Sequence, residues 1–133
     1  MQVIYCSVII QIVMKNSGLK KMSLQRSDCP LACALDIIGD KWTLLILRDI
    51  FHGKHRFSEF LESGEDIKTN ILTERLRRLE KAGFIKKEPY QDNPPRFEYH
   101  LTNTGKTLLP VIKSIVQWAH THIPGTRKPR VST

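Results

Sequence analysis

The chain has 133 residues, of which 41% are hydrophobic and 26% are charged. This length and apolar content predict one folded domain with tails, and they exclude a large multidomain enzyme and wholesale disorder. Lys and Arg number 21 against 13 Asp and Glu, a formal charge of +8, which favours a polyanionic partner such as DNA, RNA or an acidic membrane surface. The three cysteines are too few and odd in number for a disulfide scaffold, which indicates a reducing compartment.

An apolar segment over residues 3–14 opens the chain. It is too short to cross a bilayer, and the lysines follow it rather than precede it, unlike in a signal peptide. Three interpretations stay open. The segment packs on the domain or a partner, it precedes the true start at Met14 or Met22, or it is a membrane anchor. We therefore treat residues 1–28 as an N-terminal extension.

Apolar residues recurring at three and four positions predict four helices in succession. The first follows Pro30 and ends at Gly39, and the second, over 43–51, is apolar nearly all round and is expected at the buried centre. The third, over 57–63, is expected to begin at an N-cap, Ser58. The fourth runs over 68–82, with Asp66 or Thr69 as its cap and Gly83 just beyond its end.

After Gly83 the apolar period changes to two, which predicts a hairpin of strands 84–90 and 96–101 around a loop over 91–95. Residues 102–105 are expected to form a cap after the second strand. A last helix then carries a wide apolar stripe consisting of Leu108, Leu109, Ile112, Ile115, Val116 and Ala119. From residue 121 to 133 the chain is basic and polar, and we expect a loose tail.

Three helices followed by a hairpin is the order of a winged helix-turn-helix. The predicted fold class is mainly α with a small antiparallel β-hairpin, and one further helix lies on either side. In this arrangement the helix over 68–82 is the recognition helix and the hairpin is the wing.

The sequence resembles the HxlR family of winged-helix transcription regulators, which are related in architecture to MarR-type regulators. The motifs that carry the resemblance are CP at 29–30, IGDKWTLLILR at 38–48, RFSEF at 56–60, LTERLRRLE at 72–80, PPRFEY at 94–99 and LTNTG at 101–105. They span a domain over 29–120. The resemblance implies a cytoplasmic, bacterial or archaeal regulator that binds double-stranded DNA as a homodimer through its outer helices, and that is not an enzyme. Family members often carry Ser before the recognition helix, where this chain has Lys68 and Thr69, so its base preference should differ.

The segment 68–87 holds seven bases and two acids, a net charge of +5, and this locates the predicted DNA contacts. We expect base contacts from the start of the recognition helix, at Lys68, Thr69, Asn70 and Thr73. Arg77 and Lys86 are expected on phosphates, whereas Arg75 either contacts a phosphate or braces the helix against a neighbour. Arg96, at the base of the wing, contacts DNA or pairs with Asp92 or Glu98. Arg56 and Ser58 hold a phosphate at the third helix, or Ser58 only caps it.

Cys29 precedes Pro30 and is expected at a helix N-cap, where the helix dipole favours a thiolate. It matches a cysteine that serves as a redox sensor in some family members, with Cys33 one turn on as a resolving thiol. The alternative is that both are small core residues. No metal, cofactor or membrane partner is expected, and no effector can be read from the sequence. The competing function is a winged-helix module that binds proteins without reading DNA.

Overall fold

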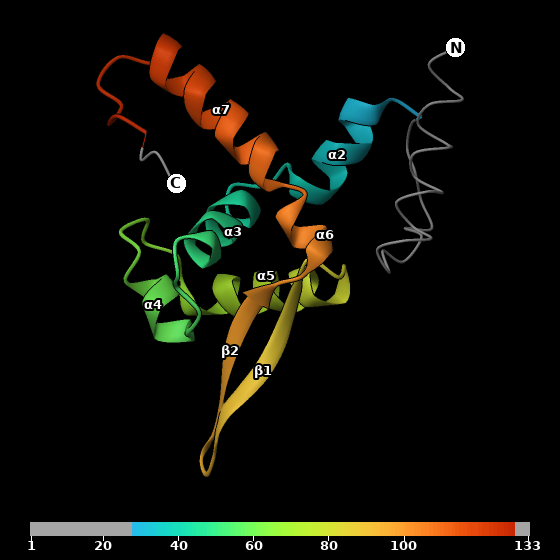
Figure 1. The fold of residues 1–133 in the computed structure, drawn as a ribbon, viewed down its shortest axis with the longest axis vertical. Coiled ribbons are helices and arrows are strands. Elements are labelled where there is room, and N and C mark those ends of the chain that lie inside the picture. The colour runs from blue at the N-terminus through green and yellow to red at the C-terminus, as the bar shows by residue number, and fades with distance from the viewer. Residues whose placement is uncertain (1–27, 130–133) are drawn as a thin grey trace.

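The computed structural model describes residues 28–129, in which four helices are followed by a two-stranded hairpin and then by further helices (Figure 1). The elements are α2 (Pro30–Ile38), α3 (Thr43–Phe51), α4 (Phe57–Leu61), α5 (Thr69–Lys81), β1 (Ile85–Asp92), β2 (Pro95–Leu101), α6 (Asn103–Lys106) and α7 (Leu109–His122). The apolar segment over 3–14, with its open interpretations, lies outside the described residues. Among the helices of residues 28–129, none is both long and apolar enough to cross a membrane.

Helices α2 and α7 extend as two arms on one side of the body, and the β-hairpin projects from the other side (Figure 1). Between them, α3 is the buried centre, as predicted, and α5 lies across the body where the hairpin begins. The core is built from apolar side chains of α3, α4, α5 and the start of β1, namely Ile46, Leu47, Ile50, Phe60, Ile67, Leu72, Leu76, Leu79, Phe84 and Ile85. The prediction of a winged helix-turn-helix is confirmed by this order and packing.

The ends of the helices confirm some predicted caps and correct others. Gly39 ends α2, where a Cβ would come within 2.2 Å of the carbonyl oxygen of Leu35. Gly83 follows the C-cap of α5 with a φ of 84°, a left-handed conformation that favours glycine. The predicted cap of α5 is wrong, because its N-cap is Lys68, and this residue accepts no hydrogen bond through its side chain.

The start of α4 also differs from the prediction. Its N-cap is Arg56, so Ser58 is the second residue of the helix and not its cap. The carboxylate of Glu59 reaches back instead, and its Oε2 accepts the backbone N–H groups of His55 at 2.7 Å and Arg56 at 2.8 Å. A carboxylate three residues into a helix satisfies first-turn donors in this way and makes a serine cap unnecessary.

The wing is longer than predicted. Strands β1 and β2 pair antiparallel from Ile85↔Leu101 to Asp92↔Pro95, with an irregularity between Pro89 and Gln91. The predicted loop over 91–95 is therefore mostly strand. Pro95 is compatible with this because proline is tolerated as the first residue of a strand. Arg96 consequently lies near the tip of the wing rather than at its base, which corrects its predicted place.

The segment after the wing forms a short helix, α6, where only a cap was predicted. The Thr102 hydroxyl accepts the backbone N–H of Gly105 at 3.1 Å and donates to the Gly83 carbonyl oxygen at 2.5 Å. A Cβ at Gly105 would lie 2.1 Å from the carbonyl oxygen of Phe84, so only glycine fits this approach. These contacts join the end of β2 to the turn after α5 and lead the chain into α7, which ends at His122, slightly inside the predicted tail.

Candidate DNA interface

Helix α5 presents a continuous polar face to solvent. Lys68, Thr69, Asn70, Thr73 and Arg77 are all exposed, opposite the buried side chains of Leu72, Leu76 and Leu79. The Thr73 hydroxyl donates to the carbonyl oxygen of Thr69 at 2.8 Å. Sequence reasoning placed these residues on one face, and the structure brings them together there.

Arg75 points away from that face. Its Nε donates to Oδ2 of Asp40 at 2.9 Å, and its Nη1 contacts Glu74. Only 21% of the Arg75 side chain is exposed. Of the two roles predicted for Arg75, the geometry matches the brace against a neighbouring segment.

Asp40 is the residue that sequence reasoning missed. Its Oδ2 accepts the backbone N–H groups of Trp42 and Thr43 at 3.0 Å, in addition to the bond from Arg75. Burial by itself raises the pKa of this carboxyl, but the hydrogen bonds from Thr43, Trp42 and Arg75 outweigh burial and hold its pKa below the ordinary value. An Asp three residues before the first apolar turn of α3 is a capping signal, and it could have been found in the sequence.

The wing carries both signs of charge. Lys86 is exposed but pairs with Glu88 through a 2.8 Å contact between Nζ and Oε1, and this pairing lowers the pKa of the Glu88 carboxyl. Lys87 lies over the ring of Phe97, 4.1 Å from its centroid. Arg96 is exposed near the tip, and neither predicted ion-pair partner, Asp92 nor Glu98, lies within salt-bridge distance of it among residues 28–129. The Arg96 guanidinium is thus available to contact DNA.

Arg56 is held against the wing. Its Nε lies 3.3 Å from Oε1 of Glu98, and its guanidinium carbon lies 4.2 Å from the centroid of the Tyr90 ring. Ser58 is exposed two residues further on. The Glu59 carboxylate beside it accepts the N–H groups of His55 and Arg56 just before α4, and those bonds lower its pKa. The predicted phosphate site at Arg56 and Ser58 is therefore less favourable in the structure than the sequence suggested, because Arg56 already has partners and a carboxylate lies beside it.

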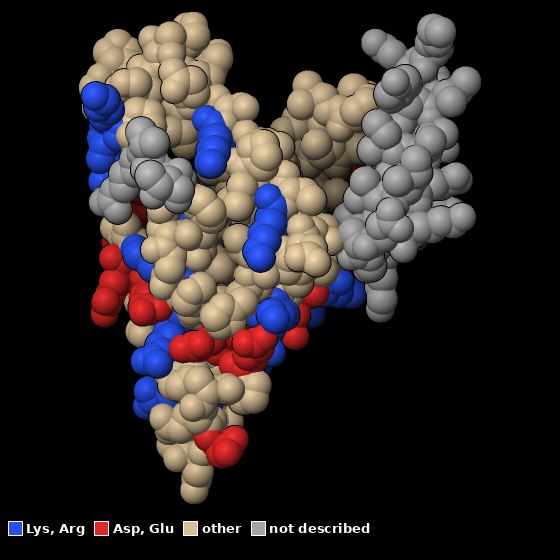
Figure 2. Space-filling model, viewed as in Figure 1, with Lys and Arg blue, Asp and Glu red and all other residues tan. Residues whose placement is uncertain are grey.

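Charge is distributed unevenly over the molecule. Figure 2 shows acidic side chains gathered where the hairpin leaves the body, while the arms are mostly uncharged. The arms expose apolar side chains instead, with Leu31 66%, Ile115 47% and Trp118 60% exposed. These side chains of α2 and α7 are therefore not part of the core formed by the described residues.

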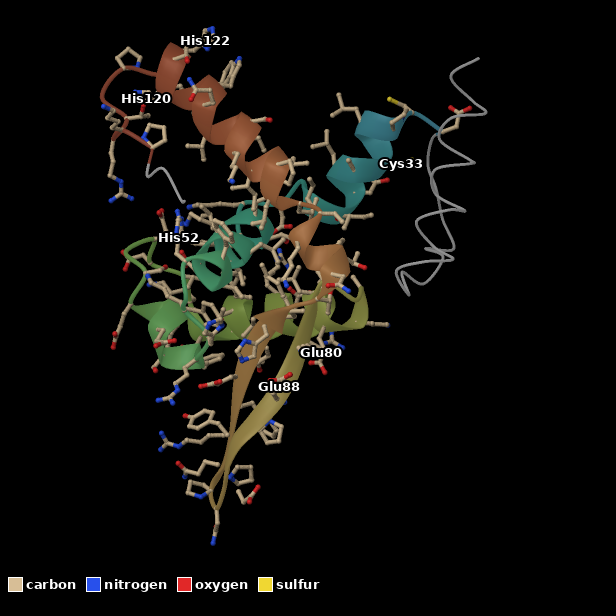
Figure 3. All side chains as sticks on the ribbon, in the orientation of Figure 1. Cys33, His52, Glu80, Glu88, His120 and His122 are labelled. Carbon is tan, nitrogen blue, oxygen red and sulfur yellow. The ribbon has the colours of Figure 1, made fainter. Side chains whose placement is uncertain are left out.

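Cys29 is the N-cap of α2, as predicted, and is exposed, whereas Cys33 is half-buried one turn further on. Figure 3 shows Cys33 on the α2 arm, far from Glu88 on the wing. The thiols therefore lie on the apolar side of the molecule and not at the polar face of α5.

Three histidine side chains, those of His55, His100 and His122, stack on other rings. The rings of His55 and His100 stack with centroids 4.3 Å apart, and His122 stacks on Trp118 at 5.1 Å. Within residues 28–129, no group of three His, Cys, Asp or Glu side chains is placed to hold a metal ion.

Comparison with known proteins identifies the family of this winged helix. The profile described as HxlR-like helix-turn-helix matches residues 37–127. The chain belongs to this family. The HxlR-like match confirms the resemblance seen in the sequence, and the chain is a transcription regulator with a helix-turn-helix DNA-binding domain.

Similar proteins occur in bacteria and archaea. This HxlR-like chain is 43% identical to the HTH-type transcriptional regulator YdeP of Bacillus subtilis over 104 residues, which cover 78% of this chain and 81% of YdeP. It is 40% identical to an HTH-type regulator of Methanothermobacter thermautotrophicus over 90 residues, 68% of this chain and 69% of the relative. Among solved structures, the redox regulator HypR in its oxidized form superposes with a TM-score of 0.65 at 36% identity, covering 76% of this chain and all of HypR.

Proposed function

We propose that the protein is a cytoplasmic, non-enzymatic regulator that binds a palindromic operator as a homodimer. The observation that supports this most is the exposed polar face of α5 beside a wing that exposes Lys86 and Arg96. Two such helices related by a two-fold axis would enter successive major grooves about one helical turn apart. The operator half-sites should then be inverted repeats.

Base readout is assigned to the start of α5. Asn70 suits adenine, Lys68 suits the O6 and N7 atoms of guanine, and the methyl groups of Thr69 and Thr73 suit thymine. Phosphate contacts are assigned to Arg77 on α5, to Lys86 and Arg96 on the wing, and more weakly to Arg56 and Ser58 at α4. All of these side chains are exposed, so each can reach DNA. The division follows from position, because the start of a recognition helix enters the major groove.

The homodimer is assigned to the arms. A monomer that leaves Leu31, Leu35, Ile115 and Trp118 in water carries an apolar surface that a second copy would cover. Both arms lie on the side of the body away from the wing, so pairing through them leaves both wings free (Figure 1).

The experiment that tests operator reading compares two substitutions on α5. A duplex is first selected from a random-sequence library by the wild-type protein. Asn70→Ala should then weaken binding to that duplex by about 10-fold, since a bidentate base contact contributes about 1–3 kcal/mol of discrimination. It should leave the affinity for a scrambled duplex unchanged.

Arg77→Gln is the matched control on the same face of α5. It should weaken both duplexes equally and lower the slope of log affinity against log salt by about 0.9, the value for one phosphate contact. Equal losses on both duplexes from Asn70→Ala would count against its base contact. A wild-type protein that selects no sequence at all would favour the protein-binding alternative.

Thiol oxidation at Cys29 is proposed as a switch of DNA binding. It is supported by the exposed position of Cys29 at the N-cap of α2 and by the likeness to HypR, which is described as a redox regulator. Two thiols lose two electrons and two protons to diamide, forming a disulfide while the diamide is reduced to its hydrazine. A disulfide at the arm would shift the two recognition helices relative to each other.

Cys29→Ser should abolish the effect of diamide on DNA affinity, whereas Cys33→Ser should retain at least part of it. The measurement is operator binding before and after diamide, followed by reversal with dithiothreitol. A Cys29→Ser protein that still loses DNA on oxidation would show that the switch lies elsewhere.

A further inference from the structure

One carboxylate connects two segments that are distant in the sequence, the start of α3 and the middle of α5. Asp40 lies between α2 and α3, and its bonds to the backbone of Trp42 and Thr43 fix the start of the buried helix. The same Oδ2 accepts the bond from Arg75, in the middle of α5 and 35 positions further along the chain. The start of the central helix is thereby tied to the middle of the helix that faces DNA.

The remaining contacts of α5 with the body hold it less directionally. They include the packing of Leu72, Leu76 and Leu79, which are buried in the core. Apolar packing is non-directional, so it resists separation of the helices more than rotation of α5 about its own axis. A guanidinium that donates to a carboxylate has a fixed geometry, and it opposes that rotation.

We propose that Asp40 is a positioning residue for operator recognition, and that it acts through Arg75 to fix the rotation of α5 about its own axis. This inference rests on the proposed function. Asn70, Thr73 and Arg77 lie on the face that this rotation would displace. Base contacts require placement within about 0.5 Å and 10–20°, whereas contacts with phosphates tolerate small displacements. Loss of the pair should therefore reduce sequence preference and leave general DNA affinity intact.

The exposure of the α5 arginines supports this assignment. Arg75 is committed to Asp40 and Glu74, whereas Arg77 and Arg78 are exposed. Arg78 pairs with Glu74 on its own helix, through an Nε–Oε1 distance of 3.8 Å. Arg75 is thus a brace rather than a phosphate contact, and the two roles predict different salt dependences.

The test uses Asp40→Asn and Arg75→Gln in the full chain. Asparagine keeps a carbonyl oxygen that can accept the N–H groups of Trp42 and Thr43, but it removes the negative charge that Arg75 meets. Each variant should lower the preference for the library-selected duplex over the scrambled one by about 10-fold, within the range of a single mismatched base pair. The affinity for the scrambled duplex and the salt slope should stay unchanged, because no phosphate contact is lost.

The double variant should lose no more preference than either single variant, since both remove one interaction. Arg78→Gln is the control, because it removes the same charge from the exposed side of α5 and should not alter the ratio of the two affinities. Thermal melting verifies that each variant is folded. If Asp40→Asn fails to fold, Arg75→Lys tests the same bond from its other end, because lysine keeps the positive charge but lacks the planar guanidinium.

Three results would overturn the inference. Asp40→Asn or Arg75→Lys, when folded, could keep the full preference. The losses of the two single variants could add in the double variant. Arg75→Gln could weaken the scrambled duplex and lower the salt slope by about 0.9, which would make Arg75 a phosphate contact. A wild-type protein that selects no duplex would instead overturn the proposed function itself, and this inference with it.

Discussion

Ile115→Asp on α7 is expected to yield a monomer that binds the selected operator about 100-fold or more weakly, because linked half-site binding contributes about 10²–10⁴-fold. Ile115 lies on the exposed stripe of the arm with Val111 and Trp118. A carboxylate placed in an apolar interface has to be desolvated without a partner, and this opposes association. Light scattering at micromolar concentration and a binding titration measure the two effects.

Gln117→Asp is the matched control, because it introduces the same charge on the same helix. Gln117 is exposed and lies two positions along, away from the stripe of Val111, Ile115 and Trp118. It should leave the dimer intact. A wild-type protein that is already monomeric, or an Ile115→Asp dimer with full affinity, would contradict the role of the arms.

Leu72→Ala on α5 is expected to lower the free energy of unfolding by about 2–5 kcal/mol. Leu72 is fully buried between α5 and the core, so its removal leaves a cavity beneath the recognition helix. For a domain of this size, each kcal/mol lowers Tm by about 4–8 °C. Urea unfolding followed by circular dichroism gives the difference directly.

Glu80→Ala provides the comparison for Leu72, since Glu80 is exposed on the same helix (Figure 3). Exposed substitutions of this kind change stability by about 0.5 kcal/mol or less. Similar losses from both variants would show that α5 is not held by its apolar face.

Much of the fold follows from local patterns. The apolar periods of α2, α3 and α5 predicted those helices, and Gly39 and Gly83 marked two of their ends. The change to period two predicted the hairpin. Helix ends at which two side chains compete for the same role were harder to predict. At α4 the Glu59 carboxylate, and not the Ser58 hydroxyl, accepts the backbone N–H of the N-cap, although both residue types are common near helix starts.

The roles of individual cations required the tertiary structure. Arg75 and Arg77 are two residues apart on one basic helix, and the sequence predicted a phosphate contact for Arg77 but left a phosphate contact or a brace open for Arg75. Only the fold shows that Arg75 meets Asp40 while Arg77 faces solvent. The pairing of β1 with β2 likewise moved Arg96 to the tip of the wing.

The sequence by itself determined the family, the order of the elements and the polar face of α5, because these depend on spacing within one segment. The tertiary structure decided which charges are free and which are paired, since a carboxylate 35 positions away selects its arginine only after α3 and α5 have packed. It also shows that the apolar stripes of α2 and α7 are exposed among residues 28–129. Burial depends on which other segments come close, and periodicity within one helix carries no information about them.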